Sequence, residues 1–457
     1  MNLKINNSIC FIANYSKTYL FHEIAQSLMQ AGGKVCWITV NLELYDFLCK
    51  EYGKEKVLLI NRGNIDQPYS AVAEFKINEL VYGDRVLRHE IQNGTRFLTN
   101  IQRPIYDFLK SNEVRLAFGE ITWAHEILIH RILTNRTELN AKFLNPHVVR
   151  LPNKRWAFFK DERQSQIYEV TDEYEEVSII EVKKPFYLKL NDKKLKKSNS
   201  LIGRLDRIKR WITNENIDKK DPTHITKGKT RLLLNSQEEF NKEIYRMVKR
   251  IDFEQVKDVP YIFVGLHKQP EASVDAFGRY YEDQYLNICN LWRALPTGWN
   301  ILVKEHTNAI GDRDLSFYNK LQEMPGIHFV HESTDSYSLI SNAQLVATIT
   351  GTIAYEAALM KIPAVTFAPT FFNRINYCEQ IGLTKLNRCA SLKEVADRLR
   401  GQIDNRAEFS SFLMANSFEG VLVDPVSMPS VMEEENIEMI CQTFLSVVQN
   451  QIELDIA

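Results

Sequence analysis

The chain has 457 residues, and its 44% hydrophobic and 25% charged residues are ordinary values for a folded globular protein. Lys plus Arg number 57 and Asp plus Glu 58, and the resulting net charge of −1 argues against a chain-wide nucleic-acid binder. The seven cysteines are scattered and include no CxxC pair, which predicts reduced thiols in a cytoplasmic protein. No window approaches about 18 uninterrupted apolar residues, so we expect no membrane-spanning segment.

The first half of the chain predicts strands and helices in alternation. An apolar run over residues 8–13 predicts a strand, helical spacing over 19–29 predicts a helix, and a run over 35–40 predicts another strand. Gly32 and Gly33 follow the predicted helix, where glycine favours a C-cap. Further strands are predicted over 57–60 and 114–118, and a helix over 122–133. This alternation indicates a parallel sheet covered on both faces.

The second half repeats the alternation more clearly. Strands are predicted over 261–266, 300–304, 327–330, 345–349 and 364–367, and helices over 281–295, 314–323, 334–342 and 353–360. This order predicts an α/β fold with a second doubly wound sheet. A last helix is predicted over 434–449, with an apolar face made of Ile437, Ile440, Phe444, Val447 and Val448.

The composition changes between the halves, where residues 183–231 hold 16 Lys or Arg and 5 Asp or Glu. This stretch is either a solvated, partly helical insertion or linker, or a surface that meets anionic lipid through a basic amphipathic helix near 201–212. Basic residues without a recognised binding motif argue against nucleic acid as the partner. The predicted domains are a Rossmann-like domain over 1–182, the basic insertion over 183–250, a second Rossmann-like domain over 251–410, and a tail with a helix over 411–457.

Polar clusters follow four predicted strands of the second half. They are His267-Lys268-Gln269-Pro270-Glu271, Lys304-Glu305-His306-Thr307-Asn308, His331-Glu332-Ser333-Thr334 and Thr350-Gly351-Thr352. Ligands of open α/β sheets bind outside the carboxyl ends of the strands, so the clusters indicate one crevice.

Single residues of these clusters have a functional and a plain interpretation. Thr350-Gly351-Thr352 precedes a helix, where free N–H groups hold phosphate or where a simple turn caps the helix. Glu356, one turn later, is a candidate acceptor for ribose hydroxyls or a solvated glutamate. His306 is a candidate donor to phosphate or a structural histidine, and Lys304 either binds phosphate or snorkels.

Two carboxylates are candidates for acid–base or nucleophilic work. Glu120 ends an N-terminal strand and suits a general base or a nucleophile in sugar chemistry, although a glutamate at a helix N-terminus is the plain alternative. Glu271 is the second candidate. Asp312-Arg313-Asp314 matches a D-x-D metal–sugar pattern, but it begins a predicted helix and is interpreted as an N-cap.

Other catalytic patterns are weak or missing. His125 and His130 would lie about 140° apart on a helix, so they cannot share a metal, and we expect no metal site. The sequence has no GxGxxG, no P-loop and no GxSxG, which argues against a dehydrogenase, an NTPase and a hydrolase elbow.

The polar clusters resemble those of bacterial capsule polysaccharide biosynthesis proteins, a family that includes capsular Kdo transferases. The resemblance covers about residues 260–370, on Leu266-His267-Lys268-Gln269-Pro270-Glu271-Ala272-Ser273, Leu295-Pro296, Val303-Lys304-Glu305-His306, Thr348-Ile349-Thr350-Gly351-Thr352, Tyr355-Glu356-Ala357-Ala358 and Ile362-Pro363. A weaker resemblance to the same family is found at Gly119-Glu120 and at Arg150-Leu151-Pro152-Asn153-Lys154-Arg155-Trp156. The chain departs from the family where Thr307, not proline, follows His306, and where Gln269-Pro270-Glu271 stands in place of aspartate.

The resemblance implies a GT-B-like fold, with two Rossmann-like domains facing a crevice. The domain over 1–182 would be the acceptor domain, and the domain over 251–410 would bind the nucleotide sugar. The resemblance also implies a role for each matched residue. His306 and Lys304 would face the donor phosphate, Thr350, Gly351 and Thr352 would cradle it, Glu356 would touch the ribose, and Gln269 and Glu271 would line the sugar site. Glu120, Glu271 and His306 would be catalytic, and Arg150, Arg155 and His267 are candidates for anion binding.

The expected function is that of a metal-independent glycosyltransferase without a resident cofactor. It would move a sugar from a nucleotide-sugar co-substrate, with a CMP-linked donor as one option, to a surface polysaccharide or its lipid-linked precursor. The expected location is the cytoplasm, including the inner face of the cell membrane. The alternatives are a CDP-glycerol-type glycerophosphotransferase, whose histidines would carry the chemistry, and a catalytically silent GT-B protein that binds glycan or scaffolds an assembly.

Overall fold

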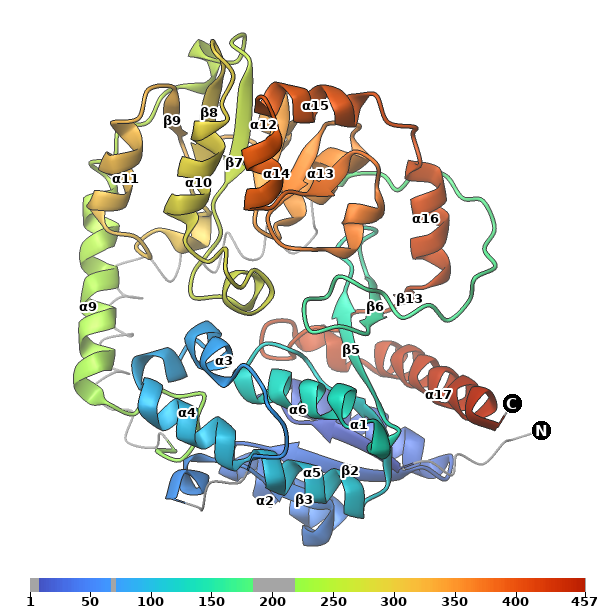
Figure 1. The fold of residues 1–457 in the computed structure, drawn as a ribbon. Helices are drawn as coiled ribbons and strands as arrows, with labels where there is room; N and C mark the ends of the chain where they lie inside the picture. Colours follow the sequence, from blue (N-terminus) through green and yellow to red (C-terminus); the bar gives the residue numbers. More distant parts are fainter. Residues whose placement is uncertain (1–7, 67–70, 184–217, 457) are drawn as a thin grey trace. The chain divides into compact units, whose positions relative to one another are not determined.

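The computed structural model describes residues 8–66, 71–183 and 218–456, without side-chain detail for 451–456. The chain forms two compact units (Figure 1). The first comprises Met1–Glu173, the described part of Lys184–Thr226, and Met414–Ala457; the second comprises Tyr174–Lys183 and Lys227–Leu413. Most of the basic stretch, including the helix predicted near 201–212, lies outside the described residues.

Within the described residues, the first unit has a seven-stranded sheet in the order β13-β6-β5-β4-β1-β2-β3. Its strands are β1 (Ser8–Ile12), β2 (Lys34–Thr39), β3 (Val57–Leu59), β4 (Val114–Phe118), β5 (Lys142–Val148), β6 (Arg155–Phe159) and β13 (Phe418–Glu419). The strands from β3 to β5 are parallel, and β6 and β13 add an antiparallel edge. The chain builds outward from β1 in both directions, so the switch point of this sheet lies between β1 and β4.

Helices from both ends of the chain cover the core of the first unit. They are α1 (Lys17–Gln30), α2 (Leu42–Tyr52), α3 (Ile77–Gly83), α4 (Ile91–Asn100), α5 (Gln102–Ser111), α6 (Ala124–Asn135) and α17 (Glu434–Ile456). One hydrophobic cluster joins apolar residues of α1, α2 and α17 to the sheet, and α5 and α6 contact β4 and β5. The C-cap predicted after the first helix is confirmed: Gly32 has φ +98°, and the Gly33 amide donates to the Leu28 carbonyl at 2.9 Å.

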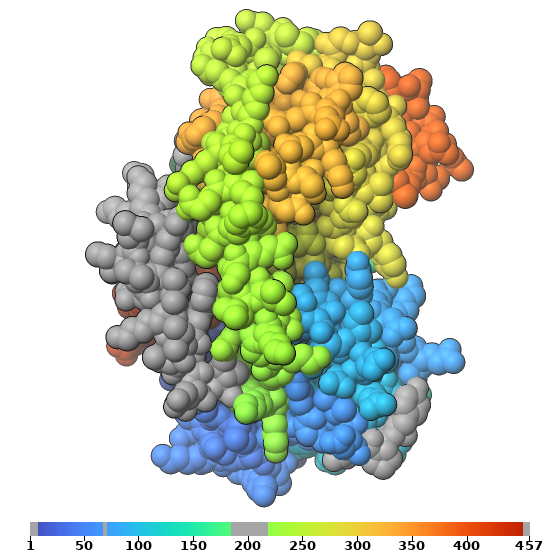
Figure 2. Space-filling model, turned by 90° about the vertical axis from the view of Figure 1, so that its left-hand side faces the viewer, coloured from blue at the N-terminus to red at the C-terminus, as the bar shows by residue number. Residues whose placement is uncertain are grey.

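The second unit has a six-stranded parallel sheet in the order β12-β11-β10-β7-β8-β9 among the described residues. Its strands are β7 (Tyr261–Gly265), β8 (Asn300–Lys304), β9 (Ile327–Val330), β10 (Leu345–Thr348), β11 (Ala364–Thr366) and β12 (Cys378–Gln380). Its helices are α9 (Gly228–Tyr245), α10 (Gln284–Arg293), α11 (Leu315–Gln322), α12 (Ser336–Ser341), α13 (Thr352–Leu359), α14 (Leu383–Arg388), α15 (Leu392–Arg400) and α16 (Arg406–Ala415). Here the switch point lies between β7 and β10, and α9 lies at the surface (Figure 2).

The predicted α/β class with two doubly wound, GT-B-like units is confirmed. Each predicted strand is present to within two residues at either end. The helix predicted to begin at 281 begins at Gln284 instead, because the Asp283 carboxylate caps it by accepting from the Leu286 amide at 2.9 Å. Among the described residues, no helix is both long and apolar enough to span a membrane.

Candidate functional site

His267 joins the two strands at the switch point of the second unit. It follows β7, and its Nε2 lies 2.7 Å from Oγ1 of Thr348, at the end of β10, and accepts from the Ile349 amide at 3.3 Å. Burial, with the charges of His306 and Arg313, lowers the pKa of His267 to about 3. The ring is therefore neutral, and it holds the strand ends together without offering a positive charge to an anion.

The contact between His267 and Thr348 leaves no room for a side chain at position 351, so this position requires glycine. A Cβ at this position would lie 2.5 Å from Oγ1 of Thr348 and 3.2 Å from Cε1 of His267. The chain can therefore turn tightly from β10 into α13, whose first residue is Thr352. The Thr350 hydroxyl donates to the Ser273 carbonyl at 2.8 Å, which fixes the loop. The N-terminal amides of α13 lie at this edge of the sheet, in the arrangement that suits a phosphate group.

Glu356 lies one turn into α13 and is only 4% exposed. The interpretation of Glu356 as a solvated helix glutamate is therefore wrong. Its contact with a ribose remains a prediction.

A buried ion pair, which the sequence interpretation missed, supports the loop after β8. Glu305 is 1% exposed and accepts from Arg313 Nη1 at 2.7 Å, from the Tyr318 hydroxyl at 2.7 Å and from the His306 amide at 2.8 Å. Arg313 also donates to the His267 carbonyl, so the loops after β7 and β8 are tied together. In the sequence, Arg313 is only the middle of the D-x-D triplet, and no spacing rule connects it to Glu305.

The two predicted phosphate ligands after β8 have different surroundings. The Lys304 ammonium donates to the Thr334 carbonyl at 2.5 Å and to the Ser336 hydroxyl at 2.7 Å. His306 is exposed, and its Nδ1 accepts from the Asn308 amide at 3.2 Å. His306 therefore has an exposed ring, whereas Lys304 holds the loop that begins α12. The contact of either residue with a phosphate remains a prediction.

Gln269 and Glu271 surround a buried aspartate. Gln269 Nε2 donates to Asp275 Oδ1 at 2.9 Å, and the Glu271 amide donates to Asp275 Oδ2 at 2.9 Å. Asp275 is 1% exposed, whereas the Glu271 side chain is exposed. The predicted N-cap is confirmed at Asp314, which accepts from the Phe317 amide at 3.0 Å.

Glu120 lies at the switch point of the first unit, directly after β4. Gly119 allows this, because a Cβ there would lie 2.7 Å from the Cβ of Ile12 on β1. The Glu120 carboxylate pairs with Lys17 in the first turn of α1, and its side chain is 18% exposed. Burial alone would raise the pKa of Glu120, but the charges of Lys17 and His147 outweigh it and the pKa is lowered. Glu120 is therefore ionised at neutral pH.

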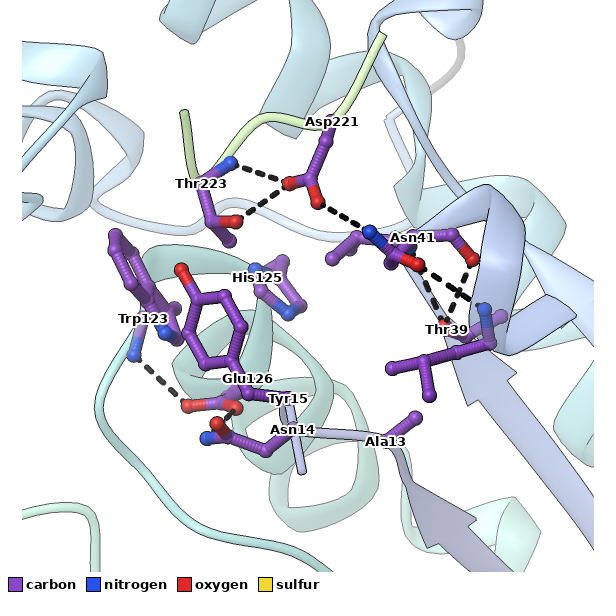
Figure 3. A pocket seen from close by; sticks show the side chains of 12 residues that line it. Ala13, Asn14, Tyr15, Thr39, Asn41, Trp123, His125, Glu126, Asp221 and Thr223 are labelled. Atoms are coloured by element: carbon purple, nitrogen blue, oxygen red, sulfur yellow. Dashed lines mark hydrogen bonds between the residues drawn. The ribbon is translucent and has the colours of Figure 1, made fainter. Parts of the chain in front are cut away.

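Asn14 connects Glu120 to a second carboxyl group, that of Glu126. Asn14 Nδ2 lies 3.4 Å from Glu120 Oε2 and 2.8 Å from Glu126 Oε1 (Figure 3 shows the Glu126 side). Glu126 also caps α6 by accepting from the Thr122 and Trp123 amides at 2.6 and 2.9 Å. Burial raises the pKa of Glu126 to about 8. The sequence interpretation assigned no role to Glu126 and missed Asn14 and Lys17.

The two candidate anion-binding arginines lie on β6 and in the turn before it. Arg155 on β6 donates through Nε to the Ser417 hydroxyl and through Nη2 to the Met414 carbonyl, both at 2.9 Å. It therefore fixes the returning C-terminal segment. Arg150 lies in the turn before β6 with φ +68°. Among the described residues, no group of three or more His, Cys, Asp or Glu side chains is arranged to hold a metal ion.

Comparison with known proteins gives similarity at the level of solved structures. No family model matches the chain, and no curated protein matches it. The beta Kdo 2,7 transferase KpsC of Thermosulfurimonas dismutans is 9% identical, with 98% of this chain and 100% of that chain covered and a TM-score of 0.38. The calicheamicin glycosyltransferase CalG4 is 12% identical, with 90% and 95% covered and a TM-score of 0.29. The UDP-GlcNAc 2-epimerase of Methanocaldococcus jannaschii, solved with UDP-GlcNAc and UDP, is 12% identical, with 87% and 93% covered and a TM-score of 0.29.

Proposed function

We propose that this protein is a nucleotide-sugar-dependent glycosyltransferase that extends a surface polysaccharide or its lipid-linked precursor. The observation that carries the proposal is the ionised carboxylate of Glu120, held by Lys17 at the switch point of the first unit. The N-terminus of α13 and the exposed ring of His306, both at strand ends of the second unit, supply groups that stabilise a departing phosphate.

The charge state of Glu120 favours one of its two chemical roles. A general base works best with a pKa near the working pH, whereas a nucleophilic carboxylate must be ionised throughout. The lowered pKa of Glu120 therefore favours the nucleophile. In that mechanism a Glu120 oxygen bonds the anomeric carbon as the bond to the nucleotide phosphate breaks. The acceptor oxygen then bonds the anomeric carbon as its bond to Glu120 breaks, and the hydroxyl proton passes to the released nucleotide phosphate. The two displacements together retain the configuration.

The decisive experiment compares Glu120→Gln with Glu113→Gln, an exposed glutamate of the same unit. We expect Glu120→Gln to lower turnover by about 10³-fold or more while nucleotide binding persists, because the amide keeps the shape but not the charge. Mass spectrometry of the wild type with donor alone should detect a glycosyl-enzyme on Glu120. Unchanged turnover in Glu120→Gln would overturn the catalytic assignment and favour a silent glycan-binding protein.

A thermal-shift screen against CMP, CDP, UDP, GDP and TDP identifies the donor class. A nucleotide that binds the folded state raises the midpoint of unfolding, and His306→Ala should reduce that shift. His328→Ala is the control, because His328 lies within β9 of the same sheet and not in a loop that follows a strand. Turnover with CDP-glycerol and not with nucleotide sugars would identify the glycerophosphotransferase instead.

We also propose that the basic stretch and α9 meet an anionic membrane surface. The stretch over 183–231 carries 16 basic and 5 acidic residues, and α9 leaves Leu233 and Phe240 65% or more exposed (Figure 2 shows this helix facing the viewer). Sedimentation with vesicles of phosphatidylglycerol and phosphatidylcholine tests this proposal. We expect binding at low salt that Leu233→Asp with Phe240→Asp weakens; the absence of wild-type binding would overturn it.

A further inference from the structure

Lys304, at the end of β8, is the lysine that the resemblance places at the donor phosphate. Its ammonium donates to the Thr334 carbonyl at 2.5 Å and to the Ser336 hydroxyl at 2.7 Å, both in the segment that begins α12. An ammonium has three N–H donors, so at most one of those of Lys304 is left for a phosphate. A second cation at this edge of the sheet would serve the phosphate better.

Lys268 is such a cation. It follows β7, directly after His267, and its side chain is partly exposed. Its ammonium forms no hydrogen bond and no ion pair with any residue of the described ranges. A partly exposed lysine without a partner can bind an anion through all three donors, and no contact within the protein has to break. Lys268 is therefore available to a ligand where Lys304 is not.

The place of Lys268 in the fold is beside the turn that begins α13. Its neighbour His267 has Cε1 3.2 Å from the position that a Cβ of Gly351 would take. The first residue of α13 is Thr352, one position later. The amides of a helix N-terminus attract phosphate, but they carry only a partial positive charge. A lysine that directly follows His267 adds the full charge that these amides lack.

Asp312 is the carboxyl group that acts against an anion at Lys268. Its Oδ2 accepts from the Gln269 amide at 3.1 Å, and no ion pair joins it to Lys268. Burial raises the pKa of Asp312 to about 6, although the hydrogen bond from Gln269 and the charges of Arg313 and Lys268 act against the shift. Asp312 is therefore mostly ionised at neutral pH, and it weakens the attraction of Lys268 for an anion without cancelling it.

The other charges that reach Asp312 are paired. Arg313 Nη1 lies 2.7 Å from Oε1 of the buried Glu305. Glu238 of α9 lies with its Oε1 2.5 Å from Nζ of Lys242. Each pair contributes little net charge, so the balance at this place is set by Lys268 and Asp312.

We propose that Lys268 binds a phosphate of the nucleotide donor beside the N-terminus of α13, and that Asp312 limits the strength of this contact. The proposal rests on the proposed function for the identity of the donor, but it concerns binding and requires no turnover. Lys268 belongs to the polar cluster after β7, yet the sequence interpretation assigned it no role. Lys304 holds the loop before α12 instead.

The test separates binding from stability. Isothermal titration calorimetry of the full chain with CMP, CDP, UDP and inorganic pyrophosphate measures the affinity, and thermal unfolding without ligand measures the stability. We expect Lys268→Met to weaken binding about tenfold or more and to leave the unfolding midpoint unchanged. Lys304→Met should lower the midpoint and change the affinity less, because the Thr334 carbonyl and the Ser336 hydroxyl lose their partner.

Three further variants distinguish a charge contact from a change of structure. Lys268→Arg keeps the positive charge and should restore most of the affinity that Lys268→Met loses. Asp312→Asn removes the opposing charge and keeps an acceptor for the Gln269 amide, so it should tighten binding about threefold. Lys320→Met, at an exposed position of α11, is the control and should bind like the wild type.

An affinity of Lys268→Met equal to that of the wild type would overturn the proposal. So would a Lys304→Met protein that keeps its unfolding midpoint but no longer binds nucleotide, or a wild type that binds none of the three nucleotides and no pyrophosphate. The proposed function is judged separately, by turnover. If a nucleotide binds through Lys268 while Glu120→Gln turns over like the wild type, the phosphate site stands and the catalytic assignment fails.

Discussion

Glu120 and Glu126 lie on either side of the Asn14 amide, yet their pKa values shift in opposite directions. Lys17 and His147 outweigh burial at Glu120, whereas burial dominates at Glu126. Two neighbouring carboxyl groups with separated pKa values differ in protonation state at any pH between those two values. Glu120 is therefore the ionised group, and Glu126 is the proton-bearing group that positions Asn14.

The proton on Glu126 predicts a pH-dependent stability. Folding raises its pKa from the ordinary 4.5 to about 8, so the folded state holds a proton that the unfolded chain releases. The free energy of unfolding should therefore fall as the pH rises through this window. The Glu126→Gln variant has no such proton. Relative to this variant, the free energy of unfolding of the wild type should fall by on the order of 1 kcal/mol per pH unit between about pH 5 and 8.

Urea unfolding at pH 5, 6.5 and 8 measures this difference. Glu51→Gln, at an exposed position of the same unit, is the control and should track the wild type at every pH. A constant difference between the wild type and Glu126→Gln across the three pH values would show that Glu126 is ionised in the folded protein.

Gly351→Ala is expected to displace His267. The added Cβ would lie 2.5 Å from Thr348 Oγ1 and 3.2 Å from the His267 ring, and both groups are buried. Such overpacking typically lowers the free energy of unfolding by about 1–3 kcal/mol. We expect a lower unfolding midpoint and a smaller nucleotide-induced shift. Gly401→Ala, whose nearest neighbour would lie 3.6 Å away, is the control. An unfolding midpoint of Gly351→Ala equal to that of the wild type would contradict the tight contact between Gly351, Thr348 and His267.

Sequence patterns selected candidate site residues that follow strands, but missed the residues whose contacts support those loops. His267, His306 and Thr350 could be found because parallel strands bring their carboxyl ends to one edge. The roles of Lys17, Glu305 and Arg313 could not be found in this way. Lys17 pairs with a residue that is distant in the sequence, and no spacing rule connects Glu305 to Arg313. The orientation of Lys304 toward the loop before α12 likewise depends on tertiary contacts.

At the scale of elements, α17 is a core helix of the first unit. Phe444 is fully buried, and its ring centroid lies 4.8 Å from that of Phe118, 5.0 Å from that of Phe158 and 5.5 Å from that of Trp156. Phe444→Ala should therefore destabilise the first unit by about 3–5 kcal/mol, measured by urea unfolding. Ser446→Ala, at an exposed position of the same helix, should change little. Equal midpoints for the two variants would contradict this packing.

The apolar spacing predicted α17 and its buried face, but not the surface it packs against. Periodicity reports that one face of a helix is apolar, and many sheets present a complementary face. The segment is directed to β6 by Arg155, which donates to Met414 and Ser417, and by the antiparallel pairing of β13. Neither contact has a local sequence signature, so β6 and β13 were not predicted.

At the scale of the whole molecule, the two units are interleaved along the chain. The first needs Met414–Ala457 in addition to its N-terminal half, and the second includes Tyr174–Lys183, whose Val177 and Ile180 amides donate to hydroxyls of α16 at 2.9 and 3.0 Å. Segments that are far apart in the sequence must be brought together, at a cost in chain entropy, before the contacts between them can stabilise the fold. The second unit depends less on it, because Lys227–Leu413 contains every strand of its sheet.

This asymmetry predicts how fragments behave. A fragment over Lys227–Leu413 should unfold cooperatively and keep the nucleotide-induced thermal shift, because it holds the complete sheet and the loops after β7, β8 and β10. A fragment over Met1–Glu173 should melt without cooperativity, because Trp156 and Phe158 would lose Phe444 and Phe418. Adding the segment Met414–Ala457 through a flexible linker should restore cooperative unfolding, measured by circular dichroism. If the fragment over Lys227–Leu413 folds but no longer responds to a nucleotide that shifts the full chain, the donor site does not lie within the second unit alone.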